Sequence, residues 1–168
     1  PLLKGQIGTF YRSNNKARGG NASITLADEM LSVTYSGSVI HADNYTAGGN
    51  FKAAGPAAVD KPGNFLNGDE VGSSAYKTEN HTLGFALKHA NHLVELKLGY
   101  QHIPEEGFPN QRMDMTSNTQ WRQNLRYLGL FDWGSLDARA YHEMIRHAMD
   151  FGDDKQFVYG VAPGIVAP

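Results

Sequence analysis

Apolar and polar residues alternate along several stretches of the chain, so that every second side chain is apolar. The clearest case is QWRQNLRYLGLFDWG (120–134), whose odd positions from Trp121 to Trp133 are mainly aromatic or aliphatic. Its even positions are mostly charged or polar, with Arg122 and Arg126 among them. Because residues of one parity share one face of a strand, this stretch predicts a half-buried strand.

The same alternation recurs in six other stretches, two of them weaker. They are LSVTYSGSV (31–39), HTLGFALKH (81–89), HLVELKLGYQ (92–101), SLDARAYHE (135–143), LKGQIGTFYR (3–12) and NASITLA (21–27). No segment shows a convincing helical spacing of apolar residues. The pattern therefore predicts an all-β protein with about seven antiparallel strands of roughly nine to thirteen residues.

The links between these strands alternate between short and long. Short links fall at 27–30, 90–91 and 134–135. Long polar links are expected at 13–21, at 41–75, at 103–120 and after residue 147. Such alternation is typical of up-and-down outer-membrane β-barrels, which have short periplasmic turns and longer extracellular loops. Loops of this length are uncommon in an ordinary compact domain.

The two tryptophans of the clearest strand match the thickness of a membrane. Twelve steps separate Trp121 from Trp133, which corresponds to about 40 Å of extended strand. At a tilt of about 45° this covers about 28 Å, close to the apolar band of about 25 Å between aromatic girdles. We therefore predict an antiparallel up-and-down transmembrane β-barrel. A soluble β-sandwich, whose strands also alternate, remains the alternative at this point.

Seven strands are too few for a closed bacterial barrel, which has at least eight. An open strand edge inside lipid would leave backbone groups without hydrogen-bond partners. The chain also begins at Pro1, without Met or a signal peptide. We therefore expect residues 1–168 to be part of a larger barrel.

Composition removes several functional classes. A net charge of −2 and a pI near 6.4 give no indication of nucleic-acid binding. The chain has no cysteine, so it contains neither a disulfide nor a thiolate ligand. HEMIRH lacks the second histidine of a zincin because Arg146 stands at that position, and no phosphate-binding loop or nucleophile elbow is present. We expect a protein that is not an enzyme.

Histidine and methionine cluster near the end of the last predicted strand. RAYHEMIRHAMDF contains two His-x-Met pairs, His142/Met144 and His147/Met149, where chance would give well under one. Met113-x-Met115 adds a further close pair. Imidazole and thioether together favour soft or borderline metal ions, copper(I) above all. Residues i and i+2 of a strand share a face, so one pair can converge on one ion.

The parity of the strand separates the two pairs. His147 and Met149 continue the odd, polar series that begins at Asp137. His142 and Met144 continue the even, apolar series and are expected in the outer aromatic girdle. His147 and Met149 are therefore the candidate ligands, provided that no β-bulge intervenes.

The segments YQHIPEEGFPNQRMDMTSN (100–118) and NLRYLGLFDWGSLDARAYHEMIRHAMDFGDDKQFVYG (124–160) resemble TonB-dependent outer-membrane receptors, and specifically their copper-receptor branch. The resemblance is dense over about residues 98–160. It implies a monomeric barrel of 22 strands that encloses an N-terminal plug and imports metal with energy delivered by TonB. In the copper branch, a His-x-Met of the barrel joins a Cys-x-x-x-Met of the plug around copper.

On this resemblance, His147 and Met149 supply the barrel half of the copper site, and Met113 and Met115 are capture ligands on a neighbouring loop. The chain would be the N-terminal portion of the barrel, without the plug or the TonB box, in the bacterial outer membrane. Its expected partners are TonB and outer-membrane lipid, and no nucleic acid. A receptor for an iron siderophore or another metallophore is the alternative within the class. A soluble β-sandwich binding module is the alternative outside it.

Overall fold

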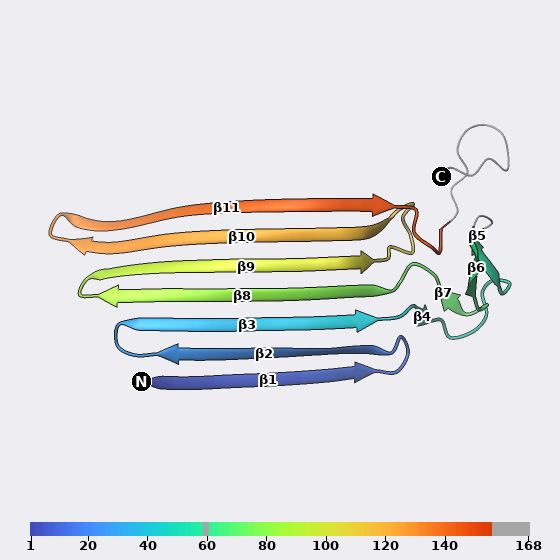
Figure 1. The fold of residues 1–168 in the computed structure, drawn as a ribbon, viewed down its shortest axis with the longest axis horizontal. Coiled ribbons are helices and arrows are strands. Elements are labelled where there is room, and N and C mark those ends of the chain that lie inside the picture. The colour runs from blue at the N-terminus through green and yellow to red at the C-terminus, as the bar shows by residue number, and fades with distance from the viewer. Residues whose placement is uncertain (59–60, 156–168) are drawn as a thin grey trace, which may run out of the picture.

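A computed structural model describes residues 1–58 and 61–155, and its main feature is one seven-stranded antiparallel sheet (Figure 1). The strands are β1 (Leu2–Arg12), β2 (Ala17–Ala27), β3 (Leu31–Ala42), β8 (Tyr76–His89), β9 (His92–Glu106), β10 (Asp114–Phe131) and β11 (Gly134–Asp150). The described residues contain no helix, and so none that would cross a membrane. The predictions of an all-β fold and of seven antiparallel strands are confirmed. Residues 156–160 of the segment that carries the resemblance lie outside the described residues.

The sheet is a meander in which each strand pairs with its neighbours along the chain. The turns at 28–30, 90–91 and 132–133 lie at one end, and the connections at 13–16, 43–75 and 107–113 lie at the other (Figure 1). We call these the turn end and the loop end. The strict alternation of short and long links was wrong at 13–16, which is only a four-residue turn.

The predicted length of nine to thirteen residues holds for β1, β2 and β3, whereas β8, β9, β10 and β11 are longer, with 14 to 18 residues. Polar residues that indicated loops continue the ladder instead, as Arg18 does opposite His41. The link expected at 103–120 shrinks to 107–113, because β9 and β10 extend toward each other. Polar residues pair in a ladder as well as apolar ones when their side chains reach water, so polarity alone does not end a strand.

The turn at 28–30 is closed by a carboxylate. Oδ1 of Asp28 accepts hydrogen bonds from the backbone amides of Leu31 and Met30, both at 2.8 Å. These two bonds, that of Leu31 first, lower the pKa of Asp28 below its ordinary value because they stabilise the charged form. This Asx-type turn sets the register between β2 and β3.

The connection 43–75 contains two small ladders, which sequence patterns did not predict. β4 (Tyr45–Thr46) pairs with β7 (Glu70–Val71), and β5 (Gly55–Ala58) pairs with β6 (Lys61–Leu66). Figure 1 shows them beyond the loop end of the sheet. They do not form a second layer over the sheet, so the described residues are not arranged as a β-sandwich.

The sheet is not closed into a barrel, and it has almost no core. β1 and β11 are its edges, each with a partner on one side only among the described strands. The buried apolar residues of the described chain are Ala17, Ala42, Ala58 and Leu66. A domain of this size normally buries large side chains between two layers. Both faces of this sheet are uncovered by the described chain instead.

The register separates an apolar face from a polar face across all seven strands. Leu96, for example, is the register partner of both Phe85 and Leu125, while the next residue, Lys97, lies beside Gly84 and Asn124. Sixteen of the twenty exposed large hydrophobic residues in these strands lie on the apolar face. The four on the polar face are Leu2, Leu130, Tyr141 and Ile145.

Candidate functional site

A row of aromatic rings crosses the apolar face toward the loop end. His81 of β8 stacks between Tyr35 and Tyr100, with ring centroids 6.0 and 6.3 Å away. Tyr100 contacts Trp121 at 4.6 Å, and the Tyr35 hydroxyl lies 2.7 Å from Nδ1 of His81. The register continues this row to Met144 of β11, the partner of Trp121.

A second aromatic cluster lies on the same face at the turn end. The ring of His92 stacks on Tyr127 at 5.9 Å and meets the edge of Phe131 at 5.3 Å. Phe131 in turn stacks on Trp133 at 4.9 Å. Between the two aromatic clusters, β9 carries only aliphatic residues on this face, namely Val94, Leu96 and Leu98.

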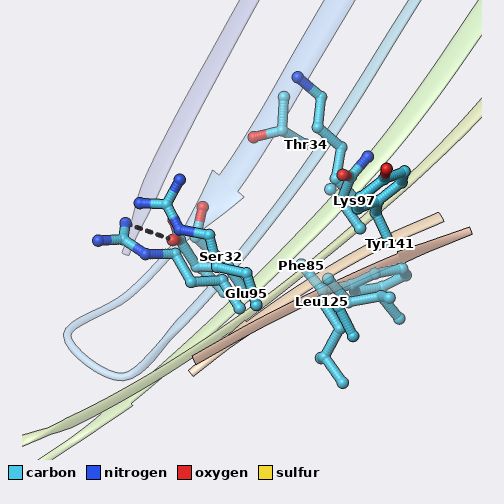
Figure 2. A pocket seen from close by; sticks show the side chains of 14 residues that line it. Ser32, Thr34, Phe85, Glu95, Lys97, Leu125 and Tyr141 are labelled. Carbon is cyan, nitrogen blue, oxygen red and sulfur yellow. Dashed lines mark hydrogen bonds and ion pairs between the residues drawn. The ribbon is translucent and has the colours of Figure 1, made fainter. Parts of the chain in front are cut away.

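The polar face carries a hollow. A hollow of about 540 Å³ opens on it over β3, β8, β9, β10 and β11. In Figure 2, the side chains of Thr34 and Lys97 point to one side of the strands and those of Phe85 and Leu125 to the other. The hollow therefore lies among the polar side chains, and the apolar side chains point away from it.

Charged residues beside the hollow are paired with one another. The guanidinium of Arg126 lies 3.2 Å from a carboxylate oxygen of Glu95 and 2.9 Å from one of Asp137. Arg139 also contacts Asp137, at 3.2 Å. The polar face thus carries these charged residues opposite the aliphatic stretch that includes Val94 and Leu96.

The two His-x-Met pairs fall on opposite faces. β11 has no bulge between Gly134 and Asp150, and the one irregularity in its pairing arises in β10. His142 and Met144 therefore lie on the apolar face, and His147 and Met149 on the polar face, as the alternation predicted. Metal binding by His147 and Met149 stays a prediction.

The β10–β11 register brings Met115 to His147 and Met149, the candidate metal half-site of the sequence analysis. Met115 is the direct partner of Met149, and Asn118 is the direct partner of His147. A bulge between Met115 and Ser117 places both residues opposite that pair, although they are three positions apart. Oδ1 of Asn118 lies 3.3 Å from Nδ1 of His147 and accepts a hydrogen bond from the Nδ1–H group, a tautomer that leaves the lone pair of the imidazole on Nε2.

Two thioethers and one imidazole thus gather at the loop end of the polar face, a donor set that suits a soft ion. Sequence reasoning placed Met115 on a neighbouring loop, which was wrong, because Met115 lies in β10. It also missed the pairing of Met115 with Met149, and it missed Asn118. Met113 precedes β10 and has no partner in the ladder. Carboxylate and imidazole groups of the described chain form no cluster of three that could hold a metal.

The connections at the loop end dock on one another beside this half-site. The carboxylate of Asp114, which is buried, accepts a hydrogen bond from the Ser73 hydroxyl at 2.6 Å and pairs with Lys155 at 2.9 Å. Asp154 accepts bonds from the side chain of Asn44 at 2.9 Å and the amide of Ser73 at 2.8 Å. A cavity of about 500 Å³ lies among these residues, and Met115 is part of its wall.

No family model, curated protein or solved structure matches the chain. The resemblance to TonB-dependent receptors, with the cargo and the membrane location that it implies, therefore stays a prediction.

Proposed function

We propose that this chain is a segment of a transmembrane β-barrel in the bacterial outer membrane, belonging to a TonB-dependent receptor. The observation that carries the proposal is the uncovered apolar face, which lies opposite a hollowed polar face. A soluble sheet covers its apolar face, because water must be excluded from hydrophobic side chains. In the described chain this sheet leaves its apolar face uncovered and carries a hollow on its polar face, which is the arrangement expected of a barrel wall in lipid.

The aromatic clusters support the same placement. Trp121 and Phe131 are ten residues apart in β10, which is about 33 Å of strand and about 25 Å at a tilt of 40°. The aliphatic band between them would span the hydrocarbon. The edges of β1 and β11 require further strands, because their free backbone groups are not tolerated in lipid. A larger barrel supplies such strands, and the resemblance implies 22.

The cargo that fits the half-site best is copper, as the ion or as a chelate. Met115, His147 and Met149 would hold it from the barrel side, with Met113 as a capture ligand on the loop. Further ligands would come from a plug, which would also carry the contact with TonB. The protein would be a transporter rather than an enzyme, because no bond of the cargo is made or broken.

Thiol labelling tests the barrel. Because residues 1–168 contain no cysteine, Leu96→Cys or Lys97→Cys introduces the only thiol of this segment, and the unsubstituted protein labelled in parallel gives the background from any other thiol. In cells, the thiol of Lys97→Cys, on the polar face, should react with a water-soluble maleimide. The thiol of Leu96→Cys should be protected and should react only with a lipid-soluble reagent. Equal reactivity of the two variants toward the water-soluble reagent would refute the membrane placement.

Metal analysis tests the cargo. In the full-length protein, His147→Ala combined with Met149→Ala should abolish bound copper. His142→Ala combined with Met144→Ala is the matched control, because the same residue types are removed from the opposite face of the same strand. Unchanged copper in the first double variant would refute the site. Iron in place of copper in the unmodified protein would favour the metallophore alternative.

A further inference from the structure

The ammonium group of Lys155 lies in a cage of oxygen atoms formed by the 107–113 connection. It donates to the backbone carbonyls of Phe108 and Gln111 at 2.7 and 2.6 Å, and it lies 3.4 Å from the carbonyl of Met113. A carboxylate oxygen of Asp114 completes the cage at 2.9 Å. The side chains of Lys155 and Asp114 are only 9% and 11% exposed. This ion pair is far more enclosed than the other pairs among the described residues.

Asp114, the acid of this pair, bonds to both the 107–113 and the 43–75 connections. Asp114 accepts hydrogen bonds from the amide of Phe108 at 2.8 Å and from the hydroxyl of Ser73 at 2.6 Å. Gly152 lies so close that a Cβ atom there would meet the Asp114 carboxylate at 2.2 Å, and its φ of +58° also favours glycine. The chain that follows β11 is therefore shaped to bring Lys155 into the cage.

We propose that Lys155 is a positioning residue for the methionine half-site, and that residues 151–155 form a strap that holds Met115 opposite Met149. Asp114 and Met115 form the end of β10 beyond the bulge, where the ladder is interrupted. Beyond the bulge they keep two register partners, Asp150 and Met149, and the Asp114 carboxylate is anchored by Phe108, Ser73 and the caged ammonium, which is the charged one of the three. The strap stands on the contacts above, whereas its effect on metal rests on the proposed function.

Lys155→Met tests the strap, because it keeps a similar length and removes the charge. In the full-length protein, hydrogen exchange of the amides of Gly107, Phe108 and Gln111 should quicken at least about tenfold, since an unpaired buried carboxylate is left behind. Lys88→Met, an exposed lysine near the turn end, is the control. Unchanged exchange in Lys155→Met would overturn the strap, and slow exchange in β9 shows that the variant is folded.

Copper(I) titration tests the positioning. Lys155→Met should weaken copper(I) binding about tenfold, as loss of a residue that orients a ligand does. Met115→Leu should weaken binding in the unmodified protein and have little further effect in Lys155→Met. Two results would overturn the positioning role but not the copper site. One is faster amide exchange in Lys155→Met with unchanged copper(I) affinity. The other is a double variant whose loss of affinity equals the sum of the two single losses. A full-length protein that binds no copper would instead refute the proposed function, while the exchange result would still decide the strap.

Discussion

Replacing Leu125 by arginine distinguishes a lipid-facing sheet from one in water. Leu125 lies at the middle of the aliphatic band beside Leu96, and it is 48% exposed in the sheet alone. In water, the change would forfeit at most about half of the 1.5–3 kcal/mol that full burial of a leucine contributes, or about 1 kcal/mol. In lipid, an arginine near the bilayer midplane costs about 2–4 kcal/mol. The two placements therefore predict different free energies of unfolding.

Ser36→Arg is the matched control, because it adds the same charge to the polar face beside Ser23 and Thr82. The assay is guanidinium unfolding of the full-length protein in lipid vesicles, followed by tryptophan fluorescence. We expect Leu125→Arg to lower the free energy of unfolding by at least about 2 kcal/mol more than Ser36→Arg does. Equal effects of the two variants would refute the reasoning, because they would place both faces in the same solvent.

Three further predictions concern other parts of the molecule. The carboxyl pKa of Asp28, measured by NMR, should lie below the ordinary value near 3.8. The stability that the charged carboxylate contributes is then present above pH 3.8 and is lost as the pH falls through the lowered pKa. Asp28→Ala should therefore destabilise the protein at neutral pH and have no effect in strong acid. Gly19→Val should lower the free energy of unfolding by about 1–3 kcal/mol, because a Cβ there would lie 2.8 Å from the backbone carbonyl of Val39 in the neighbouring strand, whereas Gly48→Val, with open space around it, should not. Asn118→Ala should weaken copper(I) binding about tenfold by releasing the ring of His147, and Asn118→Asp, which keeps the acceptor, should retain binding.

The strands and their two faces could be predicted from the sequence because the alternation is a local property. Trp121, Leu125 and Phe131 repeat every second residue or a multiple of it, and the register keeps them on one face. The ends of the strands could not be predicted in the same way. Arg18 and His41 are polar and were assigned to loops, but they pair in the ladder where their side chains reach water.

The candidate site was only half accessible to sequence reasoning. The face of His147 followed from parity, because no bulge interrupts β11. The pairing of Met115 with Met149 depends on an extra residue in β10, and nothing in the local pattern indicates that bulge. The cage around Lys155 depends on contacts more than forty residues apart in the chain, between Lys155 and Phe108. Periodicity does not report such long-range contacts.

The meander order of the strands has a consequence for the circumference of the proposed barrel. Every ladder of the sheet joins segments that follow one another in the chain, and no described bond links β1 to β11. These seven strands fix their own order and register, but they do not set the circumference of the proposed barrel. A hairpin could be added or removed beside them without disturbing any pairing already made. The diameter of the pore would then be decided by whichever strands meet last.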